Sequence, residues 1–168
     1  MKVAIISDSH DNLENLKNFF DFSRKEKIKI LIHCGDVCNG ETLKEIENNF
    51  EKIYLCLGNA DIKDSIFKNA KKTKIFEKEG EIKIGKLKIG FCHIFNIKEK
   101  NLENFNFYFF GHSHFPFLKK EKNCILANPG NLAGLFYKAT FAILDTKTKK
   151  LELKILEKIK QGSQAPGL

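Results

Sequence analysis

The chain has 168 residues, of which 42% are hydrophobic and 30% are charged, and its formal net charge is +8. This length and composition predict one globular domain, and no apolar run approaches the ~20 residues that a membrane-spanning helix needs. The short apolar start does not fit a signal peptide, and the 5 cysteines include no C-x-x-C pair. We therefore expect a cytoplasmic protein with reduced thiols and no membrane partner.

The first half of the chain alternates apolar runs with helical patterns. Asp11 is a good helix N-cap, and Glu14 stands three residues later, as in a capping box. The expected elements are a strand at 2–7, a helix at 12–25, a strand at 28–33, a helix at 41–50 and a strand at 53–57. This order predicts a parallel sheet with right-handed crossovers.

The second half of the chain has the two-residue alternation of β-strands. A hairpin is expected over 82–91, with its turn at Gly85-Lys86. Further strands are expected at 106–110, 124–127, 139–145 and 151–157. The sequence therefore predicts a mixed α/β domain over residues 1–160, followed by a tail at 161–168 without periodicity, which we expect to be disordered.

Polar residues with metal-ligand chemistry follow the strands expected in the first half. Asp8 and His10 follow the first strand. Asp36 follows the second strand and Asn59 the third, each directly after a glycine. Because the carboxyl ends of neighbouring parallel strands lie side by side, we expect these side chains to converge. Carboxylate, imidazole and amide groups suit divalent metals of intermediate hardness.

The second half supplies further imidazoles. His93 closes one expected strand, and His112 and His114 follow another as Gly-His-Ser-His. Alternation in an extended segment would place His112 and His114 on the same side. The candidate metal ligands are Asp8, His10, Asp36, Asn59, His93, His112 and His114. About this many ligands are needed for two metal ions that share a bridging carboxylate.

Other interpretations compete with each motif taken alone. Asp8-x-His10 could simply cap a helix, and the metal interpretation rests on the ordered set. We interpret His33 as a structural histidine, and Cys34 and Cys38 as core thiols rather than ligands of a soft metal. A cluster of phenylalanines could stack on nucleic-acid bases, but core packing is favoured. Its members are Phe105, Phe107, Phe109, Phe110, Phe115 and Phe117.

The ordered motifs resemble the calcineurin-like metallophosphoesterase family, whose blocks read D-x-H, G-D, G-N-H-[DE], H and G-H-x-H. The resemblance spans residues 1 to about 131 and is greatest to the small single-domain bacterial and archaeal phosphodiesterases, which share the Asn128-Pro129-Gly130 turn. It implies a sandwich of two β-sheets flanked by helices. It also implies a two-metal site that shares Asp36, with one shell completed by Asp8, His10 and His114 and the other by Asn59, His93 and His112.

The chain departs from the family pattern at two places. Ala60 stands where the larger family has a histidine that protonates the leaving oxygen, so Asp61 lacks the residue it would orient. General acid help contributes ~10²–10⁴-fold, and its absence favours substrates with good leaving groups. Ile94 and Phe95 replace the last two residues of a frequent His-Gly-His, which narrows the expected mouth of the site.

These motifs predict a dinuclear, metal-dependent phosphodiesterase in which a metal-bridging hydroxide attacks phosphorus, with Asp36, Asn59 and His93 carrying catalysis. Mn²⁺ is the favoured metal, with Fe, Ni or Zn as alternatives. The expected substrate is a small phosphoester. Alternatives are a phosphatase or nuclease acting on nucleotides, which the +8 charge suggests, and a non-catalytic, metal-stabilised scaffold for protein partners.

Overall fold

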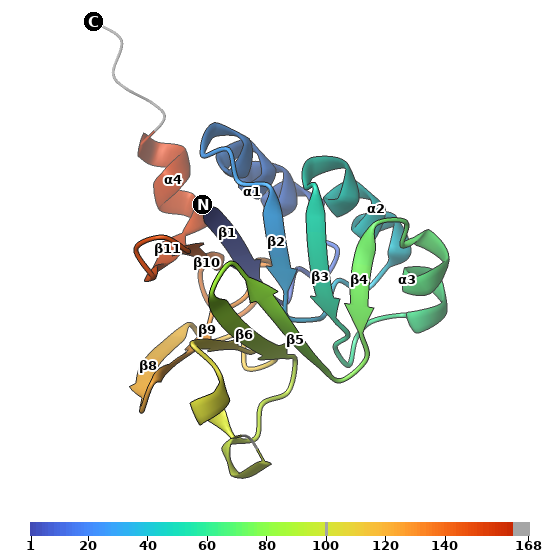
Figure 1. Cartoon of the computed structure of the whole chain (residues 1–168). Coiled ribbons are helices and arrows are strands. Elements are labelled where there is room, and N and C mark those ends of the chain that lie inside the picture. Colours follow the sequence, from blue (N-terminus) through green and yellow to red (C-terminus); the bar gives the residue numbers. More distant parts are fainter. Residues whose placement is uncertain (100, 163–168) are drawn as a thin grey trace, which may run out of the picture.

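The computed structural model describes residues 1–99 and 101–162, which form two stacked β-sheets with helices against one of them (Figure 1). The first sheet has the strand order β11-β10-β1-β2-β3-β4. Its strands are β1 (Lys2–Ile6), β2 (Ile30–His33), β3 (Lys52–Cys56), β4 (Thr73–Phe76), β10 (Thr140–Asp145) and β11 (Lys150–Ile155). β1 to β4 are parallel, whereas β10 pairs antiparallel with both β1 and β11.

The second sheet has the strand order β5-β6-β7-β9-β8. Its strands are β5 (Glu79–Ile84), β6 (Leu87–Cys92), β7 (Phe107–Phe109), β8 (Phe117–Glu121) and β9 (Cys124–Asn128). β5 and β6 form the expected hairpin around Gly85-Lys86, and β6, β7 and β9 are parallel. The carboxyl ends of β6 and β7 therefore lie side by side, as do those of β1, β2 and β3.

The helices cover one face of the first sheet. They are α1 (Leu13–Lys25), α2 (Gly40–Asn49), α3 (Lys63–Asn69) and α4 (Leu156–Gly162), with two 3₁₀ turns at Ile97–Glu99 and Leu102–Asn104. Leu16 and Phe19 of α1 are fully buried against Ile6 and Leu31 of the sheet. A second core joins the sheets, where Ile5 and Ile32 meet side chains such as Phe91. The predicted two-sheet α/β architecture is thereby confirmed.

Within the described residues, none of the helices has the length and apolar character that crossing a membrane requires.

Several local predictions need correction. Asn12, not Asp11, caps α1, because its side chain accepts a hydrogen bond from the Asn15 N–H at 3.0 Å. The Asp11 carboxylate instead accepts bonds from the Asn39 N–H and the Thr42 hydroxyl, and so fixes the start of α2. Three elements were not expected from the sequence, namely α3, β4 and β8. They are short and each contains lysine, so they lack a clear apolar pattern.

The C-terminal boundary also differs from the prediction. Residues 156–157, expected at the end of a strand, begin α4, and residues 161–162 are its last two residues. Residues 163–168 of the predicted tail lie outside the described residues. Core packing is correct for Phe107 and Phe109, and Phe105 and Phe110 pack partly buried against the same core. It is wrong for Phe115 and Phe117, which are exposed.

Candidate metal centre

The candidate ligands all lie in loops that leave the carboxyl ends of strands. Asp8 and His10 follow β1, Asp36 follows β2 and Asn59 follows β3. His93 directly follows β6, and the loop with His112 and His114 follows β7. Because the two sheets stack, their strand ends meet, and the histidines of the second sheet reach the carboxylates of the first.

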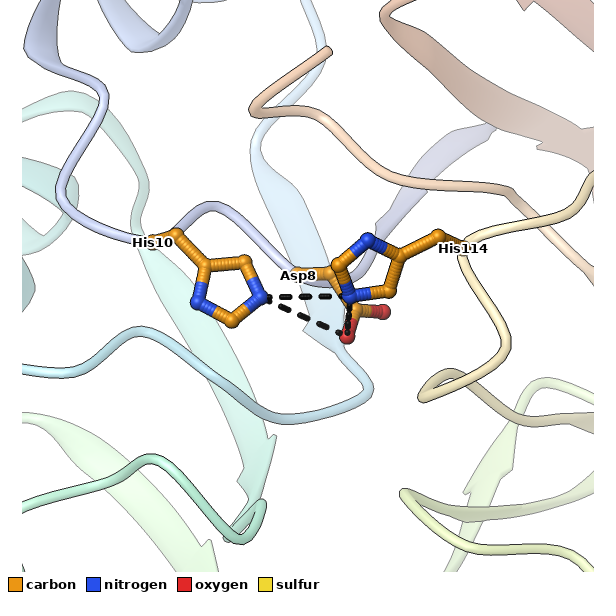
Figure 2. A group of neighbouring side chains, drawn as sticks. All are labelled: Asp8, His10 and His114. Atoms are coloured by element: carbon orange, nitrogen blue, oxygen red, sulfur yellow. Dashed lines mark hydrogen bonds and ion pairs between the residues drawn. The ribbon is translucent and has the colours of Figure 1, made fainter. Parts of the chain in front are cut away.

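Asp8, His10 and His114 form one tight group, shown in Figure 2. The Nε2 atoms of the two histidines lie 3.3 Å apart. Asp8 Oδ1 is 3.2 Å from His114 Nε2 and 3.8 Å from His10 Nε2. Asp8 is fully buried. Three ligand atoms therefore point at one small volume.

A second group lies around His93. Its Nε2 atom is 3.3 Å from Asp36 Oδ2 and 3.0 Å from Asn59 Oδ1. Its Nδ1 atom lies 2.8 Å from the Cys34 carbonyl oxygen, so Nδ1 carries the proton and Nε2 is left to face the site. The exposed ring of His112 packs edge-on against His93, with 5.1 Å between ring centroids.

The two groups are linked through their carboxylates. Asp36 Oδ2 lies 3.7 Å from His10 Nε2 as well as 3.3 Å from His93 Nε2. One ligand atom from each of Asp8, Asp36 and His93 lies within 4.8 Å of the other two, so Asp8 takes part in both groups. Asp36 and Asp8 both lie between the two sets of imidazoles.

His112 and His114 do not lie in an extended segment. The expectation that alternation places both side chains on the same side was therefore wrong. Both have left-handed backbone angles, and their rings go to different groups. The same conformation recurs among the candidate ligands. The residues with positive φ are Asp8 (52°), His10 (41°), Asp36 (59°), His112 (66°) and His114 (58°). Such backbone strain costs about 1–3 kcal/mol per residue and concentrates at functional sites.

Two glycines let the backbone approach these carboxylates closely. A Cβ atom on Gly58 would lie 2.1 Å from Asp36 Oδ1, and one on Gly111 would lie 2.0 Å from Ser7 Oγ and 2.9 Å from Asp8 Oδ2. None of these distances is possible for a real side chain. Close packing therefore requires both glycines, that of the G-N motif against Asp36 and that of the G-H motif against Ser7 and Asp8.

The electrostatics of the site depend on burial and on pairing. Burial alone would raise the pKa of Asp36, but the interaction with His93 and the hydrogen bond from the Ala60 N–H hold that pKa below its usual range. Burial would lower the pKa of His93, yet the neighbouring Asp36 and Asp8 carboxylates raise it above the ordinary value. Burial raises the pKa of Asp8. A bound cation would offset the cost of keeping both carboxylates charged.

The residues fit divalent metal ions. Asp8 Oδ1 and His114 Nδ1 are both buried, and neither atom has a hydrogen-bond partner within the described residues. Asp8 Oδ1 is the atom that faces His10 and His114, so a cation there would satisfy it. The mixture of carboxylate, imidazole and amide oxygen suits Mn²⁺, Fe²⁺, Ni²⁺ or Zn²⁺.

Asp61 organises the loop that carries Asp36, a role that was not expected from the sequence. Its carboxylate accepts hydrogen bonds from the backbone N–H groups of Asp36 at 3.1 Å, Cys38 at 2.7 Å and Gly58 at 2.7 Å. Asp61 therefore has partners here although Ala60 replaces the expected histidine. The signal for this role in the sequence was a carboxylate two residues after the candidate ligand Asn59.

Asn128 and Asn131 organise the loop that carries the two histidines. Asn128 Nδ2 donates to the Gly111 carbonyl at 2.9 Å and to Ser113 Oγ at 3.0 Å. Asn131 Nδ2 donates to the His114 carbonyl at 3.2 Å. Both asparagines are fully buried. The Asn-Pro-Gly turn thus fixes the Gly-His-Ser-His loop.

His33 is structural, as predicted. The Gly35 N–H donates to His33 Nδ1 at 3.2 Å, so the ring proton resides on Nε2, which lies 3.0 Å from Ser9 Oγ. Burial lowers the pKa of His33 to about 3, which keeps the ring neutral. Cys34 lies in the core, but Cys38 does not: its sulfur is partly buried and lies 3.5 Å from His10 Nδ1.

A hollow of about 380 Å³ opens beside the second group. Asn59 and His93 line it together with Lys63, Lys78 and Ile94. Glu77 also lines the hollow and pairs with Lys63 at 3.4 Å, so Lys78 is the lining cation whose charge Glu77 does not offset, and it suits an anionic ligand. The exposed Ile94 adds an apolar border.

Comparison with known proteins gives consistent matches. A family model described as a calcineurin-like phosphoesterase superfamily domain matches residues 1–149. A phosphodiesterase of Methanocaldococcus jannaschii is 29% identical over 167 residues, covering 94% of this chain and 100% of that protein. A solved archaeal phosphodiesterase has a TM-score of 0.81 at 26% identity, over 92% of this chain and 99% of its own. Vps29 of Chaetomium thermophilum shares the fold, with a TM-score of 0.72 at 15% identity over 92% of this chain and 95% of its own.

Proposed function

Because this chain belongs to the calcineurin-like phosphoesterase superfamily, we propose that it hydrolyses a small phosphodiester with two bound divalent metal ions. The family resemblance based on residues 1–131 is confirmed, and the family match extends further along the chain. The convergence of Asp8 Oδ1 with the Nε2 atoms of His10 and His114 is the observation that supports a metal-dependent reaction most directly.

In this proposal each ion has its own set of ligands. Asp8, His10 and His114 would hold one ion, and Asn59, His93 and His112 would hold the other. Asp36 lies between His10 and His93, which supports a bridging role for its carboxylate. Mn²⁺ is the favoured metal, and Fe, Ni or Zn also suit these ligands.

Bound divalent ions would supply a hydroxide nucleophile by lowering the pKa of a shared water, and would neutralise charge on the phosphoryl oxygens. The chain's own residues orient the metal ligands and bind the substrate. Asp36 accepts the Ala60 N–H at 2.8 Å, and the Cys34 carbonyl fixes the tautomer of His93. Lys78 attracts the anionic diester to the hollow beside Asn59 and His93, whereas Lys63 is paired there with Glu77.

The absence of a histidine at Ala60 favours diesters with good leaving groups. Near Asp36 the Ala60 position offers only a backbone N–H, which cannot act as a general acid. Hydrolysis of bis-p-nitrophenyl phosphate and of p-nitrophenyl phosphate with Mn²⁺ tests the preference for diesters over monoesters, because both substrates release p-nitrophenolate. We expect faster turnover of the diester, and a clear preference for the monoester would contradict the proposal.

A non-catalytic scaffold is the rival proposal, and the shared fold with Vps29 is the observation that motivates it. The complete set of candidate ligands argues for an enzyme, because a scaffold needs no such set. Tight binding of a protein partner without turnover of any phosphoester would favour the scaffold. A cytoplasmic location remains a prediction, consistent with five free cysteine thiols.

A further inference from the structure

An exposed aromatic ring stands at the edge of the candidate metal centre. Phe136 is 90% exposed, and its ring centroid lies 5.8 Å from that of His114. A phenylalanine is usually buried, because exposing its ring forgoes about 1.5–3 kcal/mol of hydrophobic free energy. Phe136 therefore contributes little to the core, while its position beside a candidate ligand gives it access to whatever binds there.

The loop that carries Phe136 is built into the site. Its backbone has a φ of 64°, which is unusual for a bulky side chain. Hydrogen bonds flank it: the Leu135 N–H donates to Asn131 Oδ1 at 2.7 Å, and the Tyr137 N–H donates to the Leu135 carbonyl at 2.8 Å. Asn131 in turn donates to the His114 carbonyl. The position of the ring is thus tied to the backbone of His114.

A second aromatic pair borders the same loop. Phe115, the residue after His114, packs edge-on against Tyr137 at 5.5 Å between centroids. These rings are 53% and 49% exposed. The rim of the site next to His114 is therefore aromatic, whereas the rim next to Asn59 and His93 is charged and carries Lys78 and the Lys63–Glu77 pair.

We infer that Phe136 is a specificity-determining residue that stacks on a nucleobase of the substrate, so that the preferred diester contains a nucleoside. This inference rests on the proposed function. A nucleotide carries a phosphate and a planar base on one short sugar, which matches metal ligands and an aromatic ring side by side. The net charge of +8 favours an anionic ligand of this kind over a cationic one. A protein partner seated on Phe136 would instead cover His114.

Substrates with the same leaving group test the inference. The kcat/KM of thymidine 5′-(p-nitrophenyl phosphate) is compared with that of methyl p-nitrophenyl phosphate, which has no base. In Phe136→Leu we expect the ratio of the two values to fall about tenfold, within the range of base–aromatic stacking. Phe136→Tyr should retain the ratio. Phe67→Leu, which changes a half-exposed phenylalanine of α3, is the matched control. An unchanged ratio in Phe136→Leu would overturn the inference.

A binding measurement separates this inference from the proposed function. The fluorescence of 2-aminopurine riboside 5′-monophosphate falls when its base stacks, and the chain has no tryptophan to interfere. We expect quenching by the wild type and Phe67→Leu, with about tenfold weaker binding in Phe136→Leu. Quenching without hydrolysis of any diester would leave the base site standing and remove the proposed reaction. Equal binding by Phe136→Leu and the wild type would overturn the base site even if diesters are cleaved.

Discussion

His10 and His114 direct their Nε2 atoms at each other across 3.3 Å, and both atoms face Asp8 Oδ1, a buried oxygen that accepts no hydrogen bond within the described residues. The residues come from loops about 100 positions apart in the chain, and each has a strained backbone. Packing alone gives no reason to gather two ring nitrogens and a carboxylate oxygen. A cation among these atoms accounts for the arrangement.

Metal binding should stabilise the fold through Asp8. At 100 times the dissociation constant, Mn²⁺ should add about 2.7 kcal/mol to the free energy of unfolding, a rise in Tm of roughly 5–10 °C. Asp8→Asn should lose this rise. Its metal-free form should be at least as stable as the wild type, because the buried carboxylate no longer has to be charged. Thermal unfolding with EDTA and with Mn²⁺ measures both effects.

Asp21→Asn is the control for that measurement, since Asp21 is half-exposed on α1 and pairs with Arg24. It should keep the full response to Mn²⁺. An equal Mn²⁺ response in Asp8→Asn would show that Asp8 is not a ligand.

Asp61→Asn should loosen the Asp36 loop. The amide can replace only some of the bonds that the carboxylate accepts from the N–H groups of Asp36, Cys38 and Gly58. Groups that orient metal ligands typically contribute 10–100-fold to affinity or activity, and we expect a loss of about that size in Mn²⁺ affinity. Asp64→Asn, an exposed change three residues later, should have no effect. Unchanged Mn²⁺ affinity in Asp61→Asn would contradict this role.

Asn128→Ala should disorganise the histidine loop. The change removes the donors to the Gly111 carbonyl and to Ser113 Oγ, and it leaves the buried carbonyl without its partner. We expect a ~10–100-fold loss of Mn²⁺ affinity and a loss of about 1–3 kcal/mol in the free energy of unfolding. Isothermal titration with Mn²⁺ and urea unfolding measure the two. Asn48→Ala, at an exposed position of α2, is the control, and a similar outcome for both variants would refute the assignment.

Glu47 should make stability depend on pH independently of the site. Burial would raise its pKa, but hydrogen bonds from Thr73 Oγ1 and from the N–H groups of Lys71, Lys72 and Thr73 lower it below the usual 4.5. A depressed folded-state pKa adds stability above pH 4.5, which is lost as the pH falls through the folded pKa. Glu47→Gln should therefore cost about 1–3 kcal/mol at pH 7 and less near pH 3.5.

Urea unfolding of both proteins across this pH range tests the expectation. Glu45→Gln, at an exposed position of the same helix, should show neither effect. A difference between the wild type and Glu47→Gln that does not change with pH would mean that the ionised carboxylate is not what these N–H groups stabilise.

The sequence predicted the fold because its buried strands and first two helices carry clear apolar patterns. β1, β2 and β3 are short apolar runs, and the Gly85-Lys86 hairpin alternates cleanly. The missed β8 carries Lys119 and Lys120 on an exposed edge, where pairing with β9 rather than burial defines the strand. Apolar periodicity cannot predict a strand of that kind.

The part of the candidate site that depends on strand topology could be predicted from the sequence. The carboxyl ends of parallel strands brought Asp8, Asp36 and Asn59 to one edge in the expected way. The left-handed turns at His112 and His114 were not visible in the sequence, and neither was the hydrogen bond from Asn128 to the Gly111 carbonyl that holds this loop. Phe115, the residue after His114, is exposed, and the run of phenylalanines in the sequence gave no sign of this.

The central claim is tested most directly by the hydrolysis of bis-p-nitrophenyl phosphate during a Mn²⁺ titration of the wild type, Asp36→Asn and the control Asp64→Asn. We predict metal-dependent turnover by the wild type and the control, and a loss of at least ~100-fold in Asp36→Asn, because Asp36 is placed to contact both sets of imidazoles. Equal turnover by Asp36→Asn would contradict the proposed ligand set. No turnover by the wild type with Mn²⁺, Fe²⁺, Ni²⁺ or Zn²⁺ would contradict the enzyme itself and favour the scaffold.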